Sequence, residues 1–195
     1  MDAIDLFLVR YREFRRSIFE ELIKGLSDAQ VRGRPAPQLN PIAWLLWHSA
    51  RVEDVGINRF FVDGRQVADV GNWLERMKID RRDVGTGMID REVDDLASAI
   101  DLDALRGYWD AVMAGTPAVV DKARGEDLQT VVPEPRVRRV ANEEGGVGAN
   151  AGWLTEFWAK GRTRGWILAQ TPYLHVYGHY YEARTVRALW GHPSP

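Results

Sequence analysis

The sequence of 195 residues predicts an all-α protein, a four-helix bundle with irregular insertions at about 65–100 and 125–150. Three observations favour this fold class. Apolar residues recur every three or four positions over four long stretches, which is the period of an amphipathic helix. Glycines and prolines concentrate between these stretches. β-branched runs are confined to two short segments, so we expect helices to bury their apolar faces against one another.

The first helix is predicted over residues 3–26. Its apolar face carries Phe7, Tyr11, Phe14, Ile18 and Leu22. The next stretch, "SDAQVRGRPAPQLNP", contains a glycine and three prolines and therefore cannot continue the helix. Asn40 is a good N-cap with Pro41 in the first turn, which predicts a second helix from there to about Val62.

The third helix is predicted to begin at Asp101, which can cap it, and to continue to about Ala123 with a kink at Pro117. The preceding insertion, 65–100, is irregular because glycines stand at 71, 85 and 87, although "EVDDLASAI" can form a short helix. The following insertion, 125–150, holds "TVV" and "VRRV", which predict a small hairpin or an ordered loop. Its "GGVG" lacks the Lys-Ser or Lys-Thr that a phosphate-binding loop requires.

The fourth helix is predicted to begin between Trp153 and Trp166 and to end at Trp190-Gly191. Pro172 allows two interpretations. It either bends this helix one turn before His175, or it occupies the first position of a helix that begins at Thr171-Pro172.

Composition narrows the classes of function. The size suits one domain, 1–191, with a tail at 192–195. The chain has no cysteine, which excludes disulfides, iron–sulfur clusters and thiolate zinc sites and fits a reducing compartment. The net charge is −2 and the densest basic cluster, "RVRR" at 136–139, falls in a predicted loop, so no nucleic-acid partner is expected. The N-terminus lacks the pattern of a signal peptide and no run is long enough to span a bilayer, which predicts a cytoplasmic protein without a membrane partner.

The histidines carry the strongest chemical signal. The chain has four, and His175 and His179 are four apart in "LHVYGHYYEA", on the inward stripe of the fourth helix. Imidazoles at this spacing are able to bind one metal ion. A zincin-type protease is not expected, because the residue after His175 is valine rather than glutamate. His48 shares the inward stripe of the second helix, whereas His192 lies in the tail. From spacing alone, a three-histidine metal site and a set of hydrogen-bonded core histidines both remain open.

The run "LSDAQVRGRPAPQLNPIAWLLWHSARVED", residues 26–54, closely resembles the DinB-like family of four-helix-bundle metalloenzymes, and "DLDALRGYWDAV", residues 101–112, resembles its third helix. The resemblance covers most of the chain apart from the two insertions. In that family the histidine of the "WLLWH" element and an H-x-x-x-H pair on the last helix form a divalent-metal site. The resemblance therefore implies that His48, His175 and His179 bind Zn, Ni or Fe. Many members show Gly-Gln after the second ligand of the pair, whereas this chain has "YYE".

The sequence "YYE" places Glu182 one turn beyond His179. There Glu182 is a candidate fourth ligand, an acceptor for a ligand N–H, a solvated charge, or a catalytic base. Relatives imply a metal-dependent enzyme for thiol S-transfer or thiol-assisted isomerisation, with a small-molecule substrate and a low-molecular-weight thiol. Cosubstrate binding was assigned to Trp44, beside His48, and to Arg51 on the flank of the same helix. The arginines of "RVRR" are expected to contribute if their loop folds back. Two alternatives are a metal-dependent hydrolase and a non-catalytic bundle that acts in dimerisation or partner binding, with a homodimer as the candidate assembly.

Overall fold

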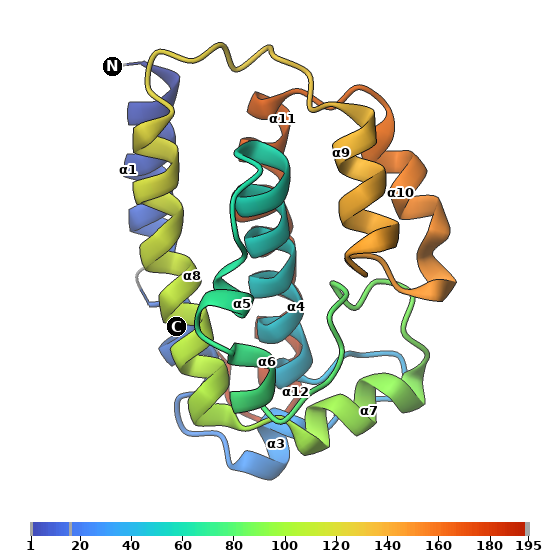
Figure 1. Cartoon of the computed structure of the whole chain (residues 1–195). Coiled ribbons are helices and arrows are strands. Elements are labelled where there is room, and N and C mark those ends of the chain that lie inside the picture. Colours follow the sequence, from blue (N-terminus) through green and yellow to red (C-terminus); the bar gives the residue numbers. More distant parts are fainter. Residues whose placement is uncertain (1, 16, 194–195) are drawn as a thin grey trace.

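The computed structural model describes residues 2–15 and 17–193, and these residues form an all-α bundle (Figure 1). Among them no strand occurs, and Val131 and Thr163 form an isolated bridge. The bundle consists of four long helical segments: α1 (Ala3–Arg15) followed by α2 (Ile18–Ile23); α4 (Ile42–Asp54) continued by the π-helical η1 (Val55–Phe61); α8 (Leu102–Lys122); and α11 (Arg164–Ala169) continued by the π-helical η4 (Gln170–Leu174) and by α12 (His175–Leu189). The predicted fold class is confirmed.

Shorter helices fill the connections. The first two segments are joined through α3 (Asp28–Arg32), and the first insertion contains α5 (Val67–Val70), α6 (Trp73–Arg76) and α7 (Asp90–Ala99). The second insertion and its continuation contain α9 (Glu134–Arg138), the π-helical η2 (Arg139–Glu143), the 3-10 turn η3 (Ala149–Ala151) and α10 (Gly152–Ala159). The short helix predicted for "EVDDLASAI" is confirmed as α7. The hairpin alternative for 125–150 is wrong, because "VRRV" is helical and packs against α10 (Figure 1).

The first two predicted helices differ from the structure, one by an interruption and the other at its start. The first predicted helix is divided into α1 and α2, with Ser17 at the N-cap position of α2. The second long segment begins at Ile42 with Pro41 at its N-cap position, and the Asn40 side chain makes no cap. Its amide instead donates to a Glu182 carboxylate oxygen at 2.9 Å, so tertiary contact replaces the local hydrogen bond.

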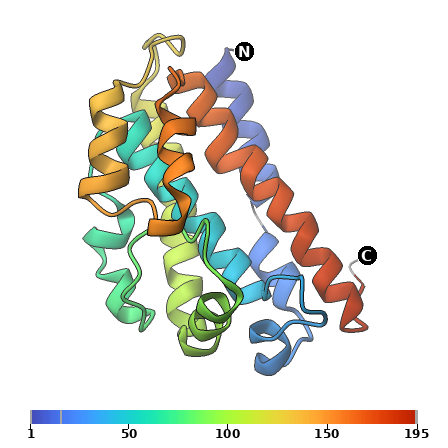
Figure 2. The same cartoon turned by 90° about the vertical axis from the view of Figure 1, so that its right-hand side faces the viewer.

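The last long segment begins at Arg164, where the Thr163 hydroxyl accepts a hydrogen bond from the Trp166 backbone N–H at 3.1 Å. α10 is separate from it, because the chain turns at Gly161 with a φ of +67°. Pro172 lies within η4 rather than at the first position of a helix, so the alternative start at Thr171-Pro172 is wrong. Figure 2 shows α11, η4 and α12 as one long, continuous element.

α4 is the central helix of the bundle, and all of its residues are buried. It contacts both α8 and α12, and it lies in the middle of the molecule in Figure 1. Its charged residues therefore need partners within the protein, since an unpaired buried charge is costly. Glu53 forms an ion pair with Arg15 at 2.8 Å and accepts a hydrogen bond from the Thr116 hydroxyl at 2.7 Å. These contacts connect α4 to α1 and α8.

A second pair of buried charged residues on α4, Arg51 and Asp54, attaches the first insertion to this helix. The Arg51 guanidinium donates to the Gln66 side chain at 2.9 Å and to the Arg82 carbonyl at 2.5 Å. The Asp54 carboxylate accepts the Val67 backbone N–H at 2.8 Å, at the start of α5. Segment 66–82 is thus fixed to α4, which places the following loop, 83–88, beside His48.

Within the described residues, no helix combines the length and the apolar character that crossing a bilayer requires. Of the predicted tail 192–195, residues 194 and 195 lie outside the described residues. The backbone N–H of His192 donates to the Arg187 carbonyl at 3.1 Å, so the tail begins directly against the end of α12.

Candidate metal centre

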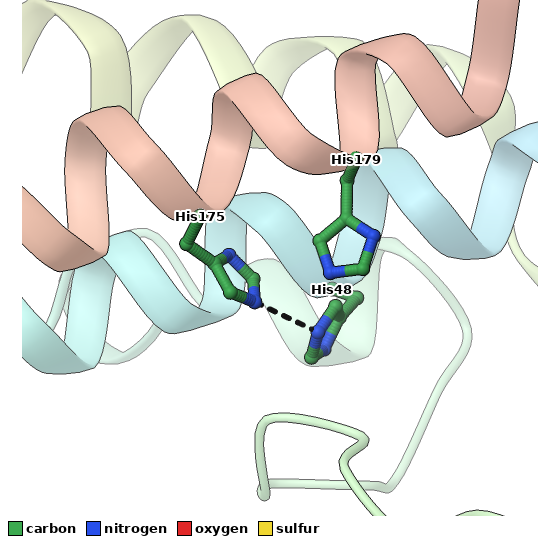
Figure 3. Close-up of side chains that lie close together, drawn as sticks. All are labelled: His48, His175 and His179. Atoms are coloured by element: carbon green, nitrogen blue, oxygen red, sulfur yellow. Dashed lines mark hydrogen bonds between the residues drawn. The ribbon is translucent and has the colours of Figure 1, made fainter.

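Three histidine rings converge between α4 and α12 (Figure 3). His48 is contributed by α4, whereas His175 and His179 extend from successive turns of α12. The Nε2 atoms of His48 and His175 are 3.1 Å apart, and one ring nitrogen from each histidine lies within 4.8 Å of the others. The helical period that predicted two inward-facing stripes therefore brings all three rings to one point.

The orientation of His48 is determined by contacts on both sides of its ring. Its Nδ1–H donates to the Val84 carbonyl, so the Nε2 lone pair points toward the other two histidines. Trp44 stacks on the same ring with centroids 4.5 Å apart and planes inclined by 13°. A ligand histidine commonly donates its second N–H to a carbonyl or a carboxylate, which fixes the tautomer.

His179 is oriented by Glu182. Its Nδ1 lies 2.8 Å from Glu182 Oε2, while Asn40 donates to Glu182 Oε1. Burial raises the pKa of Glu182, but the hydrogen bonds from His179 and Asn40 outweigh it, so the pKa is lowered and the side chain stays a carboxylate. Of the roles considered for Glu182, the geometry matches the acceptor for a ligand N–H. Both oxygens are engaged on the side of His179 away from Nε2.

Burial keeps two of the rings neutral. It lowers the pKa of His48 from 6.5 to about 3, with repulsion from His179 as the next cause. It also lowers the pKa of His175 well below the ordinary value, and both other histidines contribute in the same direction. Neutral imidazole is the form that binds a metal, so protons do not compete for these nitrogens near neutral pH.

The donor set fits a divalent ion. Two nitrogens that each bind a metal at about 2.0–2.1 Å, at bond angles of roughly 90–110°, are about 3.0–3.4 Å apart. The 3.1 Å between His48 and His175 agrees with this spacing. His175 Nδ1 is buried and has no hydrogen-bond partner within the described residues, so apart from the contact of its Nε2 with His48 this ring is held by packing. His48, His175 and His179 would therefore hold the metal.

The three rings line a pocket of about 490 Å³, a size typical of small-molecule sites. Its remaining wall is uncharged and includes the aromatic rings of Trp44 and, from α10, of Trp153. Among the described residues no lysine, arginine, aspartate or glutamate lines it. Trp153 is 61% exposed and lies at the rim, whereas Trp44 is 7% exposed. Trp44 thus lies at the pocket, against the ring of His48.

Sequence reasoning missed the loop that closes one side of the pocket. Gly85, with a φ of +85°, follows directly after the carbonyl that orients His48. A Cβ at this position would lie 2.5 Å from the Trp47 ring, so only glycine lets the backbone approach so closely. The glycines of "VGTG" were the available signal, because paired glycines often mark close backbone approach.

The predicted arginines do not line the pocket. Arg51 is fully buried, and its guanidinium contacts Asp54, Tyr108 and segment 66–82 rather than the histidines. The assignment of Arg51 to cosubstrate binding is therefore corrected to a part in anchoring the first insertion.

The "RVRR" arginines are also engaged elsewhere. Arg138 pairs with Glu134 and Glu156, while Arg136 and Arg139 contact Asp63. The segment that contains them is the helix α9 with the start of η2, and it does not fold back over the histidines.

Comparisons with known proteins bear on the family and the fold of the chain. The family model described as the DinB superfamily matches residues 12–160, which include His48 but end before the pair on α12. No curated protein matches. A solved structure, a conserved protein of Enterococcus faecalis, is similar over 97% of both chains with a TM-score of 0.69 at 21% identity, which shows a shared fold. Because the family model covers well over half of the sequence, the chain belongs to the DinB superfamily.

Proposed function

We propose that this protein is a metal-dependent enzyme that carries out thiol S-transfer or thiol-assisted isomerisation on a small molecule. The observation that carries the proposal is the position of three histidine nitrogens at the wall of an open pocket. Structural metal sites are usually closed by four protein ligands, whereas catalytic sites leave positions for water or substrate. Imidazole ligands suit Zn, Ni and Fe.

A divalent ion bound by His48, His175 and His179 would supply a Lewis acid that lowers the pKa of a coordinated thiol or water. The protein's own groups prepare the ligands for it. The Val84 carbonyl and the Glu182 carboxylate hold the rings of His48 and His179 with Nε2 toward the site. Burial keeps His48 and His175 unprotonated.

The choice of thiol chemistry over hydrolysis rests on the pocket wall. A metal-dependent hydrolase commonly uses a general base near the open coordination position. Among the described residues no carboxylate lines the pocket, and both oxygens of Glu182 are engaged by His179 and Asn40. A thiol does not need such a base, because its ordinary pKa of about 8.5 is low enough for a metal to produce the thiolate near neutral pH.

The non-catalytic alternative assigns the metal only to stabilising the bundle. The buried core extends over all four long helical segments, so the helices do not depend on three histidines for their packing. A pocket of about 490 Å³ beside the ligands also has no purpose in a purely structural site. Both observations favour the enzyme.

Metal analysis and a thiol panel test the proposal. Protein purified without a histidine tag should bind about one divalent ion per chain. His48→Ala and His179→Ala should lose it, and the matched control His192→Ala should retain it. Wild-type metal content in both ligand variants would overturn the assignment.

The metal-loaded protein should then accelerate conjugation of monochlorobimane with at least one of mycothiol, bacillithiol, glutathione and coenzyme A, and His175→Ala should abolish the acceleration. The cobalt-substituted protein should develop a thiolate-to-metal charge-transfer band with the active thiol. If no thiol changes the cobalt spectrum and none reacts faster than the buffer control, thiol chemistry is excluded in favour of the alternatives.

Location and assembly complete the proposal. We assign the protein to the cytoplasm, where low-molecular-weight thiols are reduced and where a chain without cysteine is at no disadvantage. A homodimer remains the candidate assembly, and light scattering at two protein concentrations measures it directly.

A further inference from the structure

The pocket beside the histidines has a chemical character that goes beyond its metal ligands. Four of its side chains are large aromatics: Trp44, Trp153, Phe157 and Trp158. No charged side chain lines it within the described part of the chain. A carboxylate or phosphate that entered would lose its hydration without gaining a cation from the wall, which is unfavourable. The body of a ligand that fills this space is therefore uncharged and apolar.

The aromatic wall has two parts with different surroundings. Trp158 is 5% exposed and packs edge-on against Phe60 with centroids 5.0 Å apart, so it forms a fixed surface. Trp153 is 61% exposed, and its nearest aromatic neighbour, Phe157, lies 6.4 Å away between centroids. A large aromatic ring left open at the rim of a pocket is suited to cover a flat ligand by stacking.

Of the two side-chain amides in the wall, one is available to orient a ligand. Gln170 lines the pocket together with His175, and none of the hydrogen bonds among the described residues involves its side-chain amide. The other amide in the wall, that of Asn40, already donates to Glu182. A primary amide donates to a carbonyl oxygen and accepts from an N–H or a hydroxyl, so Gln170 is able to form hydrogen bonds with the polar group of an uncharged ligand.

The π-helical turn η4 is what places Gln170 at the pocket. Residues five apart on an α-helix point about 140° away from one another. In a π-helix, with about 4.4 residues per turn, the same separation is only about 50°. Gln170 and His175 are five apart across η4, and both line the pocket. π-helical turns inside α-helices are frequent at functional sites, and here the turn aligns the amide with a metal ligand.

We infer that the substrate of this site is an uncharged aromatic compound whose carbonyl or hydroxyl oxygen is bound by the Gln170 amide, with Trp153 covering its ring. The inference rests on the proposed function for the identity of the site, because it specifies the acceptor that enters beside the thiol. It makes Gln170 a specificity-determining residue. Away from the metal position, charged compounds of the same shape are disfavoured by the uncharged wall rather than by size.

A matched pair of probes tests the inference without metal or thiol. 2-Naphthamide and 2-naphthoate have nearly the same shape and differ in charge, and binding to the chelator-treated protein is followed by quenching of tryptophan fluorescence and by calorimetry. Removal of the metal matters, since a carboxylate would otherwise bind the ion directly. We expect the amide to bind at least about tenfold more tightly than the carboxylate.

Two variants connect the preference to Gln170. Gln170→Leu should weaken 2-naphthamide by roughly two- to tenfold, the effect of one neutral hydrogen bond, and should leave naphthalene unchanged. Gln170→Glu keeps the size of the side chain but replaces the amide with a carboxylate, so it should also weaken the amide probe. Gln129→Leu, at an exposed glutamine outside the pocket, is the control and should bind like the wild type.

The inference is overturned if 2-naphthoate binds as tightly as 2-naphthamide, if neither probe binds, or if both Gln170 variants, folded by circular dichroism, retain wild-type affinity for the amide. The outcome is independent of the thiol assay. Selective binding of 2-naphthamide together with an inactive thiol panel would retain the ligand class and reject S-transfer. An active thiol panel together with no binding of either probe would retain S-transfer and reject the ligand class.

Discussion

Acidification of the metal-free protein is expected to destabilise it through His48, which is buried and neutral in the fold. Burial lowers the folded-state pKa from 6.5 to about 3, so the unfolded chain takes up a proton at higher pH than the folded chain does. The contribution of this group to stability is therefore complete above pH 6.5 and is lost as the pH falls from 6.5 toward 3. His175 acts in the same direction.

The magnitude at pH 5 follows mainly from the unfolded-state value. With a pKa of 6.5 in the unfolded chain, His48 alone lowers the free energy of unfolding by about 2 kcal/mol between pH 7.5 and pH 5. The result is insensitive to the folded-state pKa as long as that value stays about a unit below 5. A loss of about 2 kcal/mol is a large part of the stability of a typical domain, roughly 5–15 kcal/mol.

Urea denaturation at the two pH values, in the presence of a chelator, measures this effect. His48→Gln retains an amide that can donate to the Val84 carbonyl but does not titrate, so the wild type should lose about 2 kcal/mol more than this variant on acidification. His192→Gln lies outside the cluster and should follow the wild type. Equal losses in the wild type and in His48→Gln would refute a buried, neutral His48.

Three further predictions concern the centre and its supports. Glu182→Ala removes the acceptor for His179 Nδ1 and should weaken metal affinity about 10- to 100-fold. Competition with a chromophoric chelator measures this affinity, and an unchanged value would contradict the orienting role of Glu182. Gly56→Ala would place a Cβ 2.1 Å from Thr171 Oγ1, so it should lower the free energy of unfolding by about 1–3 kcal/mol, measured by thermal denaturation. The control is Gly178→Ala on α12, where a Cβ meets nothing within 4 Å and the change should be neutral or stabilising. Chelation should leave the helical circular dichroism intact, and loss of that signal would mean that the metal is required for folding.

Helical period was sufficient to predict the bundle and the convergence of the three histidines, because both depend on which face of a helix a residue occupies. The exact helix ends were harder to predict, since tertiary contacts compete with local ones. Asn40 has the chemistry of an N-cap, yet its amide binds Glu182 instead. Likewise, "VRRV" has β-branched ends but forms helix, where Arg138 and Glu134 are one turn apart and form an ion pair.

The residues that surround the three histidines could not be predicted from the sequence. Arg51 is predicted on the flank of the His48 helix, beside the pocket, but every residue of α4 is buried and the guanidinium turns to partners in the first insertion instead. A loop places the Val84 carbonyl against His48, and a π-helical turn places Gln170 at the pocket. Neither position is indicated by the α-helical spacing of apolar residues. The aromatic wall from α10 is likewise a long-range contact, which a local pattern does not encode.

The division of the pocket between chain segments has a consequence for how this protein can change. The metal ligands belong to α4 and α12, two of the long bundle helices, whereas the facing walls come from loop 83–88 and from α10, which lie in the connections. The metal ligands and the part of the wall formed by α10 therefore belong to separate segments of the chain. Exchange of α10 with the corresponding segment of a relative should change which molecules the pocket accepts while the three histidines still bind the ion, whereas exchange of loop 83–88 should also affect the ion, because the Val84 carbonyl orients His48.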